Sequence, residues 1–471
     1  MTCYESPISS AILPNKELLW RKTDVDLGAF RDIAAAHMQS PCQEFSPMNE
    51  GLYARLFLLK LGNGLEVVGR IALPVRDVVK TEAEVAAMET VRAKTSIPVP
   101  KVYLFCSDRH NPVGAEWTLM EYIPGCQLRD CFDKLSYPQK RQTATDLADV
   151  MSSLFSITGS YCGSILRAKD ITLPPRYDGG SSNPLGSQPS SRKRFSLASM
   201  IIRFRGSILR EQTPDITLPS RHSGRSISHD SRPAQSAHQV VEGTFTTGPV
   251  NDMILLDYPN QVPPELCGPF KSEREFLEAF AYHGRPGSRP EGKLERGPYE
   301  KVFEVYDAVR PLYKEPHPEP RFHLAHGDLS PANILVDPST GRITGVVDWE
   351  MAGFRPAWLA AVSAGWFNDD ARRFLMTDDM EEREGYDDES TDDTELREEL
   401  RSKLKERSEE LWFHNWEGVE LRAIFYNLCQ RVPGKAELWL QKYKQHEWPK
   451  SRGDFPFDVM EWVREQLELW G

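Results

Sequence analysis

The sequence predicts an α+β fold of two lobes, a small N-terminal lobe rich in β-strand with one helix and a larger, mainly helical C-terminal lobe. Strand-length apolar runs bounded by turn residues dominate the chain before residue 125, and helical periodicity dominates from residue 137. The length of 471 residues exceeds the roughly 100 to 200 residues of one ordinary domain. We therefore expect two lobes with extensions and insertions.

The small lobe begins with a β-hairpin. Residues 53–61 and 65–73 are both apolar and rich in strand-forming residues, and Gly62-Asn63-Gly64 between them is a strong hairpin turn signal. Helical spacing of apolar residues follows at 81–94, and a further strand is expected at 117–123. The order hairpin, helix, strand describes a compact mixed lobe.

The larger lobe begins with an amphipathic helix at 137–155, whose apolar residues form one stripe. A stretch dominated by Ser, Gly, Pro and Arg then interrupts the lobe, and this composition favours disorder. Our predicted segments are an N-terminal extension at 1–45, the small lobe at 46–125, the start of the helical lobe at 126–175, a low-complexity insertion at 176–242, the main helical lobe at 243–370, and an acidic segment with C-terminal helices at 371–471.

The composition excludes several classes of function. A formal net charge of -12 argues against nucleic acid as a partner, because binding to a phosphate backbone needs a basic face. The chain has no apolar run near the ~20 residues of a membrane helix, and its first residues lack a secretory signal. The eight cysteines form no metal-binding or redox pattern. We expect a cytoplasmic protein with no membrane contact, and no pattern identifies a protein partner.

The clearest chemical motif is His326-Gly327-Asp328-Leu329-Ser330-Pro331-Ala332-Asn333, followed by Asp348-Trp349-Glu350. Two short β runs at 334–336 and 343–347 lie between them and flank a turn at 337–341. The sequence therefore predicts a hairpin between two loops, each of which carries a carboxylate.

Phosphoryl transfer requires a group that aligns and deprotonates the attacking hydroxyl, and oxygen ligands that hold magnesium against the phosphates. Asp328 suits the first role, and Asn333 with Asp348 suits the second. The protein-kinase catalytic loop has the same Asp-to-Asn spacing and a later metal-binding Asp. An Asp in such a loop can also simply cap a turn, but the joint pattern favours chemistry.

Two departures from protein kinases identify a different relative. Gly327 replaces the kinase Arg, and Trp349-Glu350 replaces the Phe-Gly of the metal motif. The block resembles the aminoglycoside phosphotransferase and choline kinase-like family, in particular its fungal branch, over roughly residues 51–365. This resemblance implies a protein-kinase-like fold, ATP and Mg²⁺ as cofactors, Asp328 as the catalytic base, and Asn333 and Asp348 as metal ligands.

Within the resemblance, two further residues have supporting roles. Glu350 is expected to support the metal loop without being a ligand. His326 is expected to hold the catalytic loop through backbone hydrogen bonds.

The same resemblance implies nucleotide contacts in the small lobe. A basic residue on the third strand should contact phosphates and pair with a Glu of the following helix, which gives Arg70 and Glu84. An exposed strand arginine is the alternative for Arg70. Gly51 is the one glycine where a phosphate loop is expected, and the adenine-reading hinge is predicted at Glu121, Tyr122 and Ile123.

The predicted function is transfer of the γ-phosphoryl group of ATP to a small-molecule hydroxyl. A nucleotide-binding scaffold without turnover is the alternative, and a protein kinase is disfavoured by the motif departures. The dense acidic run at 378–399 has two interpretations, a solvated surface segment or attraction of a cationic substrate.

Overall fold

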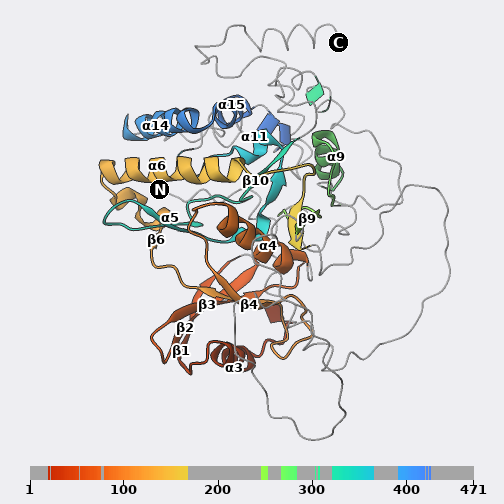
Figure 1. The fold of residues 1–471 in the computed structure, drawn as a ribbon, viewed down its shortest axis with the longest axis vertical. Coiled ribbons are helices and arrows are strands. Elements are labelled where there is room, and N and C mark those ends of the chain that lie inside the picture. Colours follow the sequence, from red (N-terminus) through yellow and green to blue (C-terminus); the bar gives the residue numbers. More distant parts are fainter. Residues whose placement is uncertain are drawn as a thin grey trace, which may run out of the picture.

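The computed structural model describes a little over half of the chain. The described residues are 20–21, 23–51, 53–75, 79–167, 245–252, 267–283, 303, 306–307, 321–364, 367, 391–419, 421–422 and 424–425. The predicted insertion at 176–242 lies outside the described residues, as do 378–390 of the acidic run and everything after 425. The described part forms two lobes, a β-rich lobe below and a mainly helical lobe above (Figure 1).

The small lobe is built on an antiparallel sheet of five strands in the order β1-β2-β3-β5-β4. The predicted hairpin is present, and Gly64 in its turn has φ 84°, which glycine adopts without steric cost. The last strand of the prediction ends at residue 121 rather than 123. The five strands are β1 (Cys42–Glu50), β2 (Ala54–Leu61), β3 (Glu66–Ala72), β4 (Val102–Cys106) and β5 (Trp117–Glu121).

Successive side chains of β3 point to opposite faces of this sheet, and a different helix covers each face. Helix α3 (Leu27–His37) packs Phe30 against Gly69, where an added Cβ atom would overlap the Phe30 ring. Helix α4 (Val79–Lys94) lies on the other face, between the sheet and the upper lobe (Figure 1). The predicted boundary at residue 46 therefore falls inside β1, and part of the predicted N-terminal extension belongs to the small-lobe core.

Helix α6 (Tyr137–Phe155) spans the larger lobe, with the bounds that the apolar stripe predicts. Gln139 accepts a hydrogen bond from the Ser136 backbone N–H at 2.8 Å, which satisfies a donor at the start of the helix. The other described helices of this lobe are α5 (Leu128–Cys131), η2 (Phe132–Lys134), α9 (Glu273–His283), α11 (Ala357–Ala360), α14 (Thr391–Arg407) and α15 (Glu409–Glu417).

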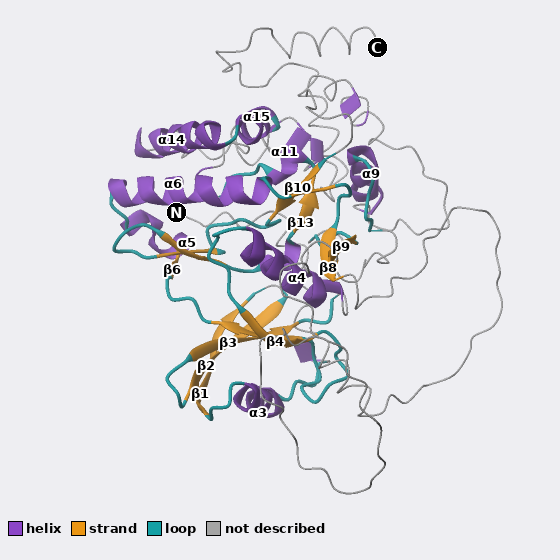
Figure 2. Cartoon of the chain, viewed as in Figure 1, coloured by secondary structure: helices purple, strands orange, loops and turns teal. Residues whose placement is uncertain are grey.

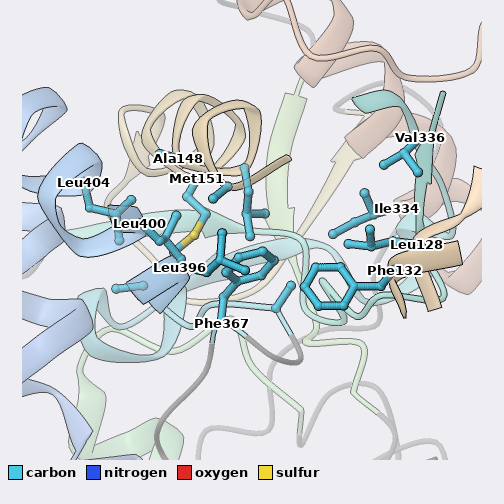
Figure 3. Close-up of a cluster of buried hydrophobic side chains, with 14 of the residues drawn as sticks. Leu128, Phe132, Ala148, Met151, Ile334, Val336, Phe367, Leu396, Leu400 and Leu404 are labelled. Carbon is cyan, nitrogen blue, oxygen red and sulfur yellow. The ribbon is translucent and has the colours of Figure 1, made fainter. Parts of the chain in front are cut away.

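Helix α14 lies along α6 and includes part of the acidic run (Figure 1). Leu396, Leu400 and Leu404 recur at helical spacing and are buried against α6 (Figure 3). Glu399 also accepts from Arg141 of α6 at 2.6 and 2.9 Å. Within α14 the acidic run therefore belongs to an amphipathic helix, whose leucines pack on α6 while Glu395 and Glu398 are exposed to solvent.

Short strands complete the larger lobe and carry the motif loops (Figure 2). The predicted hairpin at 334–336 and 343–347 is confirmed as β11 (Ile334–Val336) and β12 (Ile343–Val346), and β6 (Cys126–Gln127) pairs with β11. The remaining strands are β7 (Thr158–Gly159), β8 (Ser164–Arg167), β9 (Phe245–Gly248), β10 (Phe322–Ala325) and β13 (Gly353–Arg355). The predicted two-lobed α+β architecture is thus confirmed. None of the described helices is long and apolar enough to cross a membrane.

Candidate active site

The catalytic loop connects β10 to β11 and begins with a tight glycine. Gly327 has φ 82°, a left-handed conformation that residues with a Cβ rarely adopt. A Cβ atom at this position would also overlap the backbone carbonyl of Met351. The missing side chain therefore lets this loop pack directly against η5 (Trp349–Met351), which contains the last two residues of the metal motif.

Asp328 and Asn333 are joined within this loop. The Asn333 side-chain N–H group donates to both the backbone oxygen and the carboxylate Oδ2 of Asp328, each at 2.9 Å. Burial raises the pKa of Asp328, with Glu350 adding to the shift and the bond from Asn333 opposing it. A carboxylate with a raised pKa is a better proton acceptor near neutral pH. The amide nitrogen of Asn333 faces Asp328, which leaves the amide oxygen for a cation.

His326 has the supporting role predicted for it. Its Nε2 atom lies 3.0 Å from the Val347 carbonyl oxygen, and its Nδ1 atom accepts from the Asp328 backbone N–H at 3.3 Å. Burial lowers the pKa of His326 to about 4, so the ring is neutral at physiological pH. The imidazole thus connects the catalytic loop to the strand that leads to Asp348.

The metal loop places Asp348 in a strained conformation. Asp348 has φ 65°, an uncommon left-handed geometry for a residue with a side chain. Just before it, the Val347 backbone N–H donates to the Asn333 carbonyl oxygen at 2.9 Å. Burial and Glu350 raise the pKa of Asp348 well above its ordinary value, although Arg70 opposes this shift. The side chain still keeps 42% exposure, so its carboxylate faces accessible space.

The predicted metal ligands fit magnesium by their chemistry. Asp328 raises the pKa of Asp348 through space, so the two carboxylates share one electrostatic environment that favours a nearby cation. Magnesium binds hard oxygen atoms and commonly takes one or two protein ligands together with waters and phosphates. No three His, Cys, Asp or Glu side chains group as a metal site within the described ranges. Asn333 and Asp348 would thus hold the ion together with nucleotide oxygens.

Arg70 connects the small lobe to this site. Its Nη1 atom lies 2.9 Å from Glu84 of α4, and its Nη2 atom contacts Glu350 and lies 3.9 Å from Asp348. The structure therefore joins Arg70 and Glu84 as the sequence pattern predicts. Arg70 is only 3% exposed, so the alternative of an exposed strand arginine is wrong.

Sequence reasoning missed Lys80. This lysine lies in the first turn of α4 and is 1% exposed. Its Nζ atom lies 3.1 Å from Glu350 Oε2 and donates to the Tyr53 backbone oxygen at 3.1 Å. The available signal was the position of this lysine in the first turn of a helix, where the helix dipole disfavours positive charge. Most residues of that helix are buried.

The remaining predicted nucleotide residues lie in two places. Gly51 lies in the turn between β1 and β2, and its N–H donates to the Ala54 carbonyl oxygen at 2.9 Å. The N–H of Glu121 donates to the carbonyl oxygen of Lys101, just before β4, at 2.8 Å. Tyr122 and Ile123 lie just beyond the end of β5. Because the Glu121 N–H is already bonded to Lys101, Tyr122 and Ile123 are the predicted hinge residues that would offer backbone N–H groups to the adenine.

Comparisons with known proteins identify the family of this chain. A family model described as the phosphotransferase enzyme family matches residues 44–169 and 260–414, which together make up more than half of the chain. The chain is 24% identical over 331 residues to a subtelomeric hrmA-associated cluster protein of Aspergillus fumigatus, and the match covers 69% of this chain and 60% of that protein. It is 29% identical over 203 residues to altered inheritance of mitochondria protein 9, mitochondrial, of Candida tropicalis, covering 39% of this chain and 30% of that protein. The chain thus spans less than two thirds of the length of these relatives.

Similar solved structures are phosphotransferases by name. One is a thermostable mutant of aminoglycoside phosphotransferase APH(4)-Ia in a ternary complex with AMP-PNP and hygromycin B, with 16% identity, a TM-score of 0.40, and coverage of 94% of this chain and 97% of that chain. Another is macrolide 2'-phosphotransferase MphH of Brachybacterium faecium, with 13% identity, a TM-score of 0.38, and coverage of 89% and 96%.

Proposed function

Because this chain belongs to the phosphotransferase enzyme family, we propose that it transfers the γ-phosphoryl group of ATP, with magnesium, to a hydroxyl group of a small molecule. The observation that supports this most is the joining of two acidic loops. The Asn333 side-chain N–H group donates to Asp328, and the Asn333 backbone carbonyl oxygen accepts from Val347, the residue before Asp348. One residue therefore sets the spacing between the base and the metal carboxylate.

The charges around the site support a divalent cation. Arg70 and Lys80 are buried cations, and Glu84 and Glu350 are the buried carboxylates that they contact. These four charges balance, whereas Asp328 and Asp348 remain as two further carboxylates with raised pKa values. A doubly charged cation would offset this excess. Held by Asn333 and Asp348, magnesium would neutralise the negative charge that develops on the phosphates during transfer.

Each residue then has a defined task in the reaction. Asp328 aligns the acceptor hydroxyl and takes its proton as the acceptor oxygen bonds to the γ-phosphorus atom, while the bond to the β-phosphate oxygen breaks and ADP leaves. Asn333 and Asp348 would hold the metal ion, and Arg70, whose Nη2 atom lies 3.9 Å from Asp348, would contact the phosphates. Tyr122 and Ile123 offer backbone groups to the adenine.

A scaffold that binds nucleotide without turnover is the second candidate. The turn between β1 and β2 contains Gly51 where a glycine-rich loop would be expected, and both ends of the Arg70 guanidinium contact carboxylates. These features favour a weak hold on the phosphates. Mg-ATP binding without product formation would support this candidate.

The test separates binding from chemistry. Binding of Mg-ATP to the native state should raise the free energy of unfolding by about 2.7 kcal/mol at 100 times the dissociation constant. Turnover is then measured by release of ADP across a library of hydroxyl compounds that includes amino sugars and amino alcohols. Asp328→Asn should abolish turnover and leave Mg-ATP binding intact, whereas Asp348→Ala should weaken both.

A matched control lies at the other end of the same hairpin. Asp337 lies in the exposed turn between β11 and β12 and binds Ser339 and Thr340, so Asp337→Asn should leave turnover unchanged. If wild type and Asp328→Asn formed equally little product with every acceptor, although both bound Mg-ATP, the enzyme proposal would be wrong and the scaffold would stand.

A further inference from the structure

Lys80 is a buried cation whose partners explain its position. An ammonium group taken out of water needs strong compensation, and the start of a helix is an unfavourable place for a positive charge. Lys80 is 1% exposed in the first turn of α4. It finds compensation in two oxygens, the Glu350 carboxylate and the Tyr53 carbonyl, each 3.1 Å from its Nζ atom. These two contacts offset the free-energy cost of burying the Lys80 charge. An apolar residue with a purely structural role would not carry this cost.

These two partners belong to different parts of the nucleotide site. Tyr53 lies at the end of the turn between β1 and β2, and its carbonyl oxygen also accepts from the Leu73 backbone N–H at 2.7 Å. Glu350 lies two residues after Asp348, the predicted metal ligand. A single ammonium group thus ties the turn expected to cover the phosphates to the loop expected to hold the metal.

Lys80 also changes what Arg70 can do. Arg70 contacts Glu84 through Nη1 and Glu350 through Nη2. Without Lys80, this guanidinium would be the one cation left in contact with Glu350 among the described residues. With Lys80 sharing Glu350, less of the Arg70 charge is committed to that carboxylate. The Arg70 Nη2 atom lies 3.9 Å from Asp348, so Arg70 can then direct an N–H group toward a phosphate bound beside Asp348.

We propose that Lys80 is a positioning residue for the nucleotide, which fastens the β1–β2 turn to the metal loop and frees Arg70 for the phosphates. This inference rests on the proposed phosphotransferase function. Lys80 contacts no substrate itself and acts through Tyr53, Glu350 and Arg70. Its effect should therefore fall on nucleotide affinity more than on the rate of the chemical step.

The experiment compares Lys80→Met, Glu350→Gln and the double variant with wild type. Hydrogen exchange of the Gly51 and Leu73 amides reports on the turn, because their hydrogen bonds lie beside the Lys80 contact. We expect about tenfold faster exchange at these amides in both variants that lack Lys80. We also expect about tenfold weaker binding of Mg-ATP. In a turnover assay, KM for ATP should rise while kcat changes little.

The double variant separates positioning from charge balance. Lys80→Met alone leaves the buried Glu350 carboxylate with one partner fewer and can unfold the chain. Combining Lys80→Met with Glu350→Gln removes the charge of that carboxylate and should restore overall stability. If the double variant also regained wild-type exchange at the turn and wild-type affinity for Mg-ATP, Lys80 would only balance charge, and the proposal would be overturned.

A lysine on β2, the strand that follows the β1–β2 turn, provides the control. Lys60 of β2 pairs with Glu44 of β1 at 2.9 Å, and both side chains are exposed. Lys60→Met should leave turn exchange and nucleotide affinity unchanged. If wild type failed to bind Mg-ATP, the proposed function would fail, whereas the exchange rates would still decide whether Lys80 fastens the turn.

Discussion

Gly327 and Met351 approach so closely that a Cβ atom on Gly327 would overlap the Met351 carbonyl oxygen. This contact joins the start of the catalytic loop to the end of the metal motif. It also explains a departure seen in the sequence, because the arginine found at this position in protein kinases has no room in this backbone. The packing of two backbones thus fixes where Asp328 lies relative to Asp348.

Gly327→Ala should therefore impair both stability and turnover. The added methyl group meets backbone atoms that cannot move independently, and φ 82° disfavours any side chain. We expect a loss of about 1 to 3 kcal/mol in the free energy of unfolding and a loss of turnover of at least about 100-fold, as for a small displacement of catalytic groups. Chemical denaturation and ADP release measure the two effects.

Gly64→Ala separates strain from packing. Gly64 also has a positive φ, 84°, but a Cβ atom there would meet nothing within 4 Å. This variant should lose only about 1 kcal/mol of stability and keep its turnover. Equal loss of turnover in the two variants would show that the Gly327 contact has no special role.

The Arg70 ion pairs predict a large effect of charge removal. Arg70→Met removes the ion-pair partner of Glu84 and leaves Glu350 with Lys80, and removal of one partner from a buried ion pair costs about 3 to 5 kcal/mol. Arg70→Lys should cost less, because an ammonium keeps the charge but cannot span both carboxylates as the planar fork does. Urea denaturation measures both variants.

Arg31→Met is the control for Arg70. The pair of Arg31 and Asp32 on α3 is exposed on both sides, and such pairs are worth about 0 to 1 kcal/mol. A loss for Arg70→Met as small as that of the control would show that the buried pair is replaceable.

Local signals made much of the site predictable. The two loops and the hairpin between them lie within 25 residues, from His326 to Glu350, so spacing and turn residues suffice to place Asp328, Asn333 and Asp348 on adjoining loops. The pair of Arg70 and Glu84 was also predictable, because the family resemblance implies a basic residue on the third strand that pairs with a Glu of the following helix. The chemical roles of these residues stay predictions until the variants are tested.

Long-range packing decided what the sequence left unpredicted. Lys80 and Glu350 are 270 positions apart. The helical periodicity of apolar residues in α4 does not show what the helix packs against, because α4 is buried on nearly every side. The packing of α14 on α6 was likewise hidden by its acidic residues, because Arg141, which pairs with Glu399, is 258 positions away in the sequence. Both features required the tertiary arrangement.

His326 predicts a specific dependence of stability on pH. Its pKa is lowered by burial to about 4 from the ordinary 6.5, so between these values the unfolded chain binds a proton that the folded chain excludes. Stability from this residue is complete above pH 6.5 and is lost as the pH falls toward 4, by about 3 kcal/mol in total. Denaturation at several pH values should show a steeper slope for wild type than for His326→Gln.

An exposed histidine supplies the comparison. The His110 side chain is 80% exposed, so His110→Gln changes a histidine that lies outside the buried catalytic loop. A slope for His326→Gln that matched wild type would mean that His326 is protonated in the folded loop.

The packing of α14 on α6 predicts that α14 contributes to the stability of the larger lobe. Leu400 is 1% exposed in a cluster with Leu396, Leu404 and residues of α6 (Figure 3). Leu400→Ala should lower the free energy of unfolding by about 2 to 5 kcal/mol, because it removes buried methyl groups and leaves a cavity. Glu398 of the same helix is exposed, so Glu398→Ala should change stability by less than about 0.5 kcal/mol. Equal, small effects of the two substitutions would mean that α14 does not depend on this interface.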